Sequence, residues 1–271
     1  MFDGRKPIRG GIPFIFPQFG QWNYGMNGPP YHGFARISKW QLEKGPERMP
    51  SGDIEAIFSL CDSDFTYSMW QHHFKISYRI ILREKELHLN IGVYNPSKEG
   101  SFDFNVMLHS YFKCPDVRRC QVTGLNGITF LDRTRTGPEG PPGSPPPQPP
   151  AYQECREVVT LNEWTDRSPS HLLSHKSLKY VCNVFRVYIN TPLPHEHIVT
   201  NVVSGRKMRI QKYNLPDTII WNPWAEKAKE LSDFGDDEHP NMICVNPGHV
   251  STPVTLLPGQ AYEASLILQV M

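Results

Sequence analysis

Two arginines beside glycine-containing stretches are the first residues whose types suggest chemistry. Arg9 precedes Gly10 and Gly11, and Arg36 ends the run His-Gly-Phe-Ala-Arg that begins at His32. Paired glycines let a backbone approach a ligand closely, and the planar guanidinium group suits phosphate or carboxylate. These segments therefore indicate an anion site. The alternative is a Gly/Pro-rich loop that carries ordinary surface arginines.

A histidine in an apolar run is the strongest acid/base candidate. His109 lies within residues 107–112, and imidazole is the side chain that titrates near neutral pH. The alternative is a core or surface histidine with no chemical role. His195 and His197 have the alternation that places two imidazoles on one face of a strand, but Pro194 and the lack of a third ligand argue against zinc there.

Two tryptophans mark a second segment with functional residue types. Trp221 and Trp224 can form an apolar platform that stacks on a sugar ring, and core packing is the alternative for at least one of them. The chain has no Gly-x-x-x-x-Gly-Lys, no dinucleotide fingerprint after a strand and no Gly-x-Ser-x-Gly. Nucleotide and acyl-transfer chemistry therefore lack their usual sequence support.

Period-two alternation predicts the strands that must position these residues. The clearest pair is 74–82 and 87–94, which reads as a hairpin across 83–86. Further strands are predicted at 102–112, 119–125, 156–164, 180–189, 198–203, 207–213, 218–221, 242–245 and 261–270. One short stretch, 225–231, has helical composition. Strands this numerous predict an all-β sandwich or barrel.

Composition limits the class of protein. The 271 residues carry a net charge of +1, so nothing indicates nucleic acid or an anionic membrane as a partner. No apolar run approaches the ~18 residues of a spanning helix, and the first residues have no signal-peptide core, so we expect a cytoplasmic protein. The six cysteines are scattered without Cys-x-x-Cys, which favours reduced, mostly buried thiols.

A proline-rich stretch interrupts the strand pattern at 137–150. It holds 8 prolines and 3 glycines in 14 residues and cannot bury apolar surface. We therefore predict an extended or disordered loop inserted between two strands, not a domain boundary. Residues 1–271 are expected to form a single domain.

Six sequence blocks follow one another from residue 8 to residue 248: IRGGIPFIFPQFG, HGFAR, LHSYF, TDR, WNPWAEKAKELSDFGDDE and NMICVNPG. Together, and in this order, they resemble the glucose-6-phosphate 1-epimerase group of the galactose-mutarotase-like (aldose 1-epimerase) superfamily. The resemblance implies a galactose-mutarotase-like β-supersandwich whose concave face binds a hexose 6-phosphate. It further implies interconversion of α and β anomers without cofactor or metal, and we expect a monomer.

The resemblance also implies a role for individual residues. His109, in the LHSYF block, would be the general acid toward the ring oxygen. Arg9 and Arg36 would hold the phosphate region of the substrate, and Asp166, in the TDR block, would bind sugar hydroxyls. Ring opening needs one group to take the proton of the anomeric hydroxyl and another to protonate the ring oxygen, and reclosure on the other face reverses both steps.

The chain departs from the family pattern in three places. Asn246 stands where the family has its general-base glutamate, and an amide does not accept a proton near pH 7. Tyr31 stands where a substrate-binding glutamine is usual, and it offers only a hydroxyl. The chain also begins about eight residues before the RGG block, where the family has additional strands, so an exposed sheet edge is expected.

Three interpretations remain open from the sequence. The chain is a hexose-6-phosphate 1-epimerase in which another carboxylate or a water replaces the missing base. Alternatively, it is a sugar-phosphate-binding pseudoenzyme that Asn246 prevents from turning over. The short N-terminus and the proline-rich insertion also allow a truncated product that does not fold stably.

Overall fold

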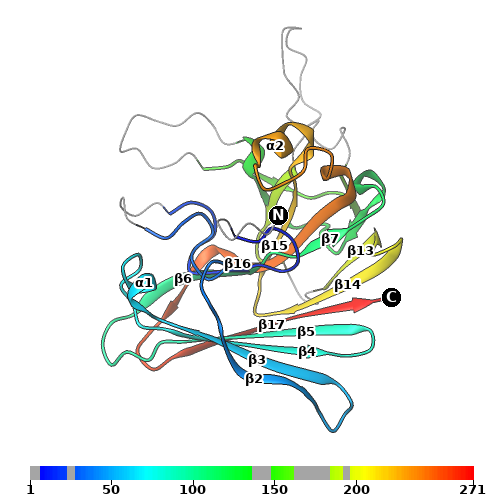
Figure 1. Ribbon diagram of the computed structural model, residues 1–271. Helices are drawn as coiled ribbons and strands as arrows, with labels where there is room; N and C mark the ends of the chain where they lie inside the picture. The colour runs from blue at the N-terminus through cyan, green and yellow to red at the C-terminus, as the bar shows by residue number, and fades with distance from the viewer. Residues whose placement is uncertain (1–6, 23–27, 136–147, 162–183, 192–195) are drawn as a thin grey trace.

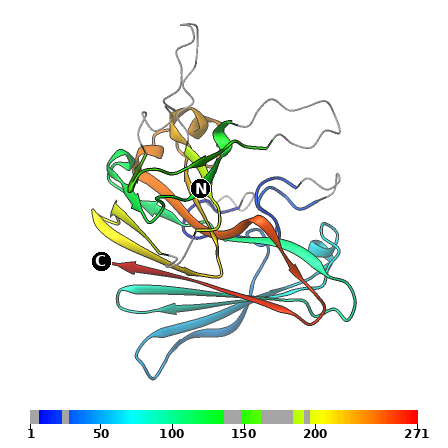
Figure 2. The same ribbon diagram turned by 180° about the vertical axis from the view of Figure 1, so that it is seen from behind.

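Two antiparallel sheets face each other across one large apolar core (Figure 1). The computed structural model describes residues 7–22, 28–135, 148–161, 184–191 and 196–271. Strands from distant parts of the chain lie side by side, as the red C-terminal strand does beside the blue-green strands in Figure 2. The prediction of an all-β sandwich is therefore confirmed.

The eight-stranded sheet carries the residues of interest. Its order is β1-β6-β16-β15-β12-β9-β10, and β7 also pairs with β16. The strands are β1 (Phe14–Ile15), β6 (Phe102–Leu108), β7 (Tyr111–Lys113), β9 (Thr129–Asp132), β10 (Ala151–Gln153), β12 (Val184–Tyr188), β15 (Asp217–Asn222) and β16 (Met242–Leu256).

The nine-stranded sheet has the order β11-β8-β13-β14-β17-β5-β4-β3-β2. Its strands are β2 (Gln41–Arg48), β3 (Ile54–Cys61), β4 (Lys75–Leu82), β5 (Glu86–Tyr94), β8 (Gln121–Thr123), β11 (Val158–Thr160), β13 (Glu196–Val202), β14 (Arg206–Tyr213) and β17 (Ala261–Val270). The helical elements are α1 (Asp64–Tyr67), α2 (Trp224–Glu230), η1 (Val117–Arg119), η2 (Arg133–Arg135) and η3 (His239–Asn241).

Alternation along the strands gives the eight-stranded sheet two different faces. One face contributes residues such as Val245 and Ile220 to the core between the sheets. The opposite face carries a small separate apolar cluster, Ile15, Met107, Val187 and Ile219. Because successive side chains of a strand point to opposite faces, this cluster lies on the side turned away from the nine-stranded sheet.

Several predicted elements are confirmed. The hairpin of β4 and β5 has Leu82 opposite Leu87, and the predicted strand 261–270 matches β17. The predicted helix at 225–231 is α2. The proline-rich stretch connects two paired strands, since Ala151 lies opposite Leu131, as an inserted loop requires. Its residues 137–147 lie outside the described residues.

Other predicted strand boundaries were wrong, and some strands were not predicted. The predicted strand 102–112 is broken between β6 and β7, because His109 and Tyr111 donate their backbone N–H to Pro13 and Gly11 in the N-terminal segment instead of to a neighbouring strand. Strand β16 continues to Leu256, well beyond the predicted end at residue 245. Strands β2 and β3 were not predicted, and β2 forms an almost fully exposed edge.

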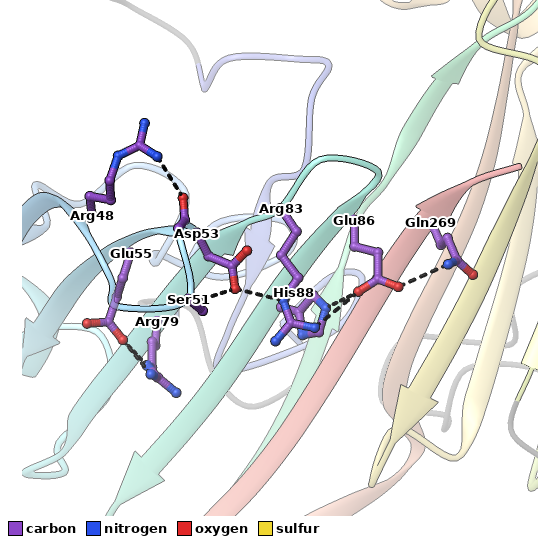
Figure 3. A network of polar contacts seen from close by, with 10 residues as sticks. Arg48, Ser51, Asp53, Glu55, Arg79, Arg83, Glu86, His88 and Gln269 are labelled. Atoms are coloured by element: carbon purple, nitrogen blue, oxygen red, sulfur yellow. Dashed lines mark hydrogen bonds and ion pairs between the residues drawn. The ribbon is translucent and has the colours of Figure 1, made fainter.

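The outer face of the nine-stranded sheet carries a polar network (Figure 3). Glu55 lies between Lys44, at 2.6 Å, and Arg79, at 2.5 Å, and is itself buried beneath them. Glu86 contacts His88 at 2.7 Å and accepts a hydrogen bond from Gln269. These contacts, most of them between neighbouring strands, cover a solvated sheet face and lie on a different sheet from the candidate site.

Candidate functional site

A cavity of about 340 Å³ lies on the side of the eight-stranded sheet that faces away from the core. This volume is within the usual range for small-molecule sites. Its lining includes Ile8, Arg9, Pro13, Ile15, Phe19, Tyr31, His32, Arg36, Met107, His109, Tyr111, Phe185, Ile219, Trp221, Lys227, Leu231 and Asn246. Five of the six site residues predicted from the sequence are in that set. The sixth, Asp166, lies outside the described residues.

Strand register places His109 and Asn246 side by side. Gly248 pairs with Met107 on one side of the break between β6 and β7, and Cys244 pairs with Tyr111 on the other. Both pairs share one register, which puts Asn246 opposite His109 on the neighbouring strand. Directly opposed residues of an antiparallel pair have Cβ atoms about 4.5–5.5 Å apart.

Two further cross-strand pairs extend the cavity floor. Ile219 lies opposite Asn246, and Phe185 lies opposite Trp221. All four side chains line the cavity. The floor is therefore polar at His109 and Asn246 and apolar or aromatic beside them, which suits a sugar ring with one reactive edge.

A close approach between two loops positions His32 and Arg36. Gly33 has φ of +77°, and a Cβ at this position would lie 2.0 Å from the carbonyl oxygen of Phe16. Only glycine fits there, and it lets Ala35 donate its backbone N–H to that same carbonyl at 3.2 Å. The backbone between His32 and Arg36 is thus held directly against the N-terminal segment.

The segment around Arg9 is held by β7 and by the loop after α2. Arg9 donates Nη1 to the hydroxyl of Tyr111 at 3.1 Å and Nη2 to Oδ1 of Asp233 at 3.0 Å. The adjacent Gly11 has φ of +67° and accepts the backbone N–H of Tyr111. The glycines next to Arg9 therefore serve the backbone path that brings this arginine to Tyr111.

His109 is buried among rings and cations. Its imidazole stacks on Tyr111 with ring centroids 4.5 Å apart and meets the edge of Trp221 at 5.9 Å. Burial, and then the positive charges of Arg9 and Arg36, lower the pKa of His109 to about 3. The imidazole is consequently neutral at pH 7 in the unliganded protein.

His32 is a second imidazole of the cavity, 6.1 Å from His109 between ring centroids. The backbone N–H of Gly20 donates to its Nδ1 at 2.9 Å. Burial, together with His109 and nearby arginines, lowers the pKa of His32 well below its usual range. A neutral His32 whose Nδ1 accepts carries its hydrogen on Nε2, so it can donate to a ligand oxygen.

Four side chains of the cavity lining have buried polar atoms with no hydrogen-bond partner among the described residues. The atoms are Oδ1 and Nδ2 of Asn246, Nε of Arg9, Nε of Arg36 and Nδ1 of His109. Buried polar groups are normally paired, and an unpaired one costs free energy. Together they offer a polar ligand three N–H donor atoms, one amide oxygen acceptor and one imidazole nitrogen whose role depends on the tautomer.

The other residues that the sequence singled out lie in different environments. Tyr31 is half exposed at the cavity, and its backbone carbonyl accepts from Nη2 of Arg36 at 2.7 Å. Trp221 lines the cavity, whereas Trp224 packs against the core between the sheets. His197 contacts Oγ1 of Thr218 at 2.8 Å, and its expected partner His195 lies outside the described residues.

Sequence reasoning missed four residues of this site. His32, Tyr111, Lys227 and Asp233 all lie in blocks that were singled out, yet none was given a role. His32, Tyr111 and Lys227 line the cavity, and Asp233 holds Arg9. The available signal was their position within the HGFAR, LHSYF and WNPWAEKAKELSDFGDDE blocks.

The family model for aldose 1-epimerase matches residues 1–269 of the chain. This chain belongs to the aldose 1-epimerase family. It is 28% identical over 280 residues to a Cenchrus ciliaris protein named "Putative glucose-6-phosphate 1-epimerase". The match covers 99% of this chain and 72% of that protein. A Salmonella typhimurium protein of the same name is 24% identical, with 91% of this chain and 69% of that protein covered.

Solved structures of other proteins share the fold of this aldose 1-epimerase family member. The structure of a "putative mutarotase" from Salmonella typhimurium has a TM-score of 0.77 at 20% identity and covers all of this chain and 77% of its own. The Slr1438 protein of Synechocystis sp. PCC 6803 has a TM-score of 0.71 at 15% identity, covering 98% and 80% of the two chains. These likenesses confirm the galactose-mutarotase-like sandwich.

None of the helices described is long and apolar enough to cross a membrane. Within the same residues there is no group of three His, Cys, Asp or Glu side chains that could hold a metal ion. The expectations of a cytoplasmic location, a monomer and a cofactor-free reaction stay predictions.

Proposed function

We propose that this chain interconverts the α and β anomers of a hexose 6-phosphate, with glucose 6-phosphate as the first candidate. The observation that carries the proposal is a pair of buried guanidinium Nε groups, of Arg9 and Arg36, that have no hydrogen-bond partner among the described residues and share a cavity with His109 and Asn246. Guanidinium N–H groups suit phosphate oxygens. The names of the relatives from Cenchrus ciliaris and Salmonella typhimurium point to the same substrate.

The covalent structure of the sugar supports this arrangement. The ring oxygen and C6 are both bonded to C5, so a 6-phosphate and the acid that protonates the ring oxygen must act close together. Arg9 bonds to Tyr111, and the ring of Tyr111 stacks on His109. The anomeric hydroxyl is bonded to C1, the other neighbour of the ring oxygen, so the group that faces it should adjoin His109, as Asn246 does by register.

In the proposed reaction, the proton of the anomeric hydroxyl leaves while His109 gives a proton to the ring oxygen. The C1–O5 bond breaks, and the products are the aldehyde and the C5 hydroxyl. Rotation about C1–C2 and reclosure on the other face return both protons. Asn246 can orient the anomeric hydroxyl but does not accept its proton, so a water must carry that proton. Losing a positioned base typically lowers the rate by a factor of ~10² to 10⁴.

A second candidate function is binding of a sugar phosphate without turnover. The observation that favours it is Asn246, an uncharged side chain beside His109 on the cavity floor. The two candidates share a binding site and differ in rate. They are therefore separated by a measurement of exchange, accompanied by a measurement of affinity.

The test is the anomer-exchange rate of glucose 6-phosphate by magnetisation-transfer NMR, with calorimetry for binding. The natural chain, Asn246→Glu and a control variant, Asn90→Glu on the other sheet, are compared. Exchange above the buffer rate with the natural chain supports the epimerase. Exchange with the Asn246→Glu variant but not with the natural chain supports the second candidate, binding of a sugar phosphate without turnover. Absence of both binding and exchange in folded samples would refute both candidates.

A further inference from the structure

The charge balance of the cavity is uneven in the unliganded protein. Arg9 and Arg36 both line it, and one carboxylate, Asp233, neutralises Arg9. Arg36 has no carboxylate partner among the described residues. Its Nη2 donates a hydrogen bond to the backbone carbonyl of Tyr31. With an amide at position 246, the lining that is described contains no acidic side chain. Among the described residues, the cavity lining therefore carries more positive than negative charge.

Burial, and then this positive charge, oppose the role of an acid at His109. They lower its pKa to about 3, so the imidazole is almost wholly neutral at pH 7. Its Nδ1 is buried and lacks a hydrogen-bond partner within the described residues. None of the described lining residues is a carboxylate that could balance an imidazolium, so an anionic ligand is a source of the compensating charge.

We propose that the phosphate of the bound sugar supplies this charge, so that His109 takes up a proton from solvent only when a phosphorylated sugar occupies the cavity. A phosphate monoester is largely a dianion at pH 7. Bound between Arg9 and Arg36, it neutralises the guanidinium charges that oppose protonation of His109. This inference rests on the proposed function. It adds that the phosphate favours phosphorylated substrates in two ways, by binding to the arginines and by allowing His109 to become the acid.

Other titratable groups lie near His109 and could compete with it for the proton. They are Tyr111, His32, Cys244 opposite Tyr111, Lys227, Asp233 behind Arg9, and Arg133, which stacks on Phe19 and Phe185. His32 is the main competitor, because it is also buried and neutral. Its Nδ1 already accepts from the backbone N–H of Gly20, and protonation there would break that bond. His109 has no such bond to lose at Nδ1.

The experiment uses 1,5-anhydroglucitol 6-phosphate, a sugar phosphate that lacks the anomeric hydroxyl and cannot react, beside unphosphorylated 1,5-anhydroglucitol. The chain is labelled with ¹⁵N-histidine, the His32 and His109 signals are assigned with His32→Asn and His109→Asn, and each complex is titrated from pH 4 to pH 8. We expect the 6-phosphate to raise the pKa of His109 by about 1 to 3. The unphosphorylated analogue, at saturation, should leave it unchanged.

Calorimetry in buffers of different ionisation enthalpy gives an independent count of protons taken up on binding. Arg36→Met should raise the pKa of His109 in the free protein and reduce the phosphate-linked uptake, whereas Arg36→Lys, which keeps the charge, should retain it. Binding of the 6-phosphate with His109 still neutral, or uptake by His32 instead, would overturn this inference and leave the proposed function standing. Failure of the 6-phosphate to bind would overturn both.

Discussion

At the scale of single residues, the site depends on polar atoms that the fold leaves without partners. Arg9 is the clearest case, because Tyr111 and Asp233 hold its Nη atoms while its Nε stays buried and unpartnered within the described residues. A phosphate oxygen would complete this set of hydrogen bonds. Charge-assisted hydrogen bonds contribute about 1.5–3 kcal/mol each.

Arg9→Ala should accordingly weaken glucose 6-phosphate binding by about 1.5 to 3 kcal/mol, roughly 10- to 150-fold. Isothermal titration calorimetry checks this value. Arg79→Ala is the matched control, since Arg79 also pairs with a carboxylate but lies on the other sheet, and its affinity should match that of the natural chain. Equal affinity in the Arg9 variant would remove this residue from phosphate recognition.

Replacing Asn246 should affect the stability of the fold and the binding of sugar phosphate differently. Both of its amide atoms are buried without partners among the described residues, and such groups destabilise a fold. Asn246→Leu, of similar size, should leave the free energy of unfolding unchanged or raise it by about 1 kcal/mol while weakening sugar-phosphate binding. Urea unfolding and calorimetry measure the two effects. A clear loss of stability would indicate that the amide has a structural role.

At the scale of elements, the turn at Gly33 determines where His32 and Arg36 lie. Gly33→Ala places a Cβ on a backbone that is already left-handed and pushes it against the carbonyl of Phe16, so we expect a loss of about 3 kcal/mol or more in unfolding free energy. Gly52→Ala has a similar φ of +91° but open space around the added Cβ, and should cost about 1 to 2 kcal/mol. Denaturant unfolding of both variants isolates the clash, and equal losses would contradict its importance.

Local pattern predicted the elements whose two faces differ, such as β4, β5 and β17. It did not predict β2, because an exposed edge strand containing Gly45 and Pro46 shows no apolar alternation. It also ended β16 too early, since Pro247 and Gly248 normally interrupt a strand. Gly248 is needed there, because a Cβ would lie 3.0 Å from the Cβ of Met107 on the neighbouring strand.

Several residues that line the cavity were named from the sequence, but their arrangement in space was not predicted. The blocks that resemble the family pointed to Arg9, Arg36, His109 and Asn246, and these residues line one cavity. That His109 adjoins Asn246 depends on pairing between strands more than 130 residues apart. Such long-range register is set by tertiary packing and is not visible in local alternation.

At the scale of the whole molecule, a polar link joins the two sheets inside the core. Lys212 of β14 donates its ammonium to Oγ1 of Thr218 in β15 at 2.6 Å, and to the backbone carbonyls of Pro216 and Asp217. His197 of β13 contacts the same Thr218 hydroxyl. Burial lowers the pKa of Lys212 to about 7, although the carboxylate of Asp217 acts in the opposite direction.

This buried lysine predicts how stability depends on pH. Between pH 7 and about 10.5, the unfolded chain keeps the proton of Lys212 while the folded chain has lost it. The unfolded state then binds more protons, so the contribution of Lys212 to the unfolding free energy rises with pH, by up to about 1.4 kcal/mol per pH unit. Below pH 7 both states hold the proton, and the contribution is constant.

The measurement is urea unfolding at pH 6, 7, 8 and 9 for the natural chain and for Lys212→Met. The natural chain should gain stability relative to the variant above pH 7, and the difference should be level from pH 6 to pH 7. Lys75→Met removes an exposed lysine of β4 that water surrounds in both states, so its difference curve should stay flat. A flat curve for Lys212→Met as well would mean that the ammonium stays charged in the core, with the carbonyls of Pro216 and Asp217 compensating its burial.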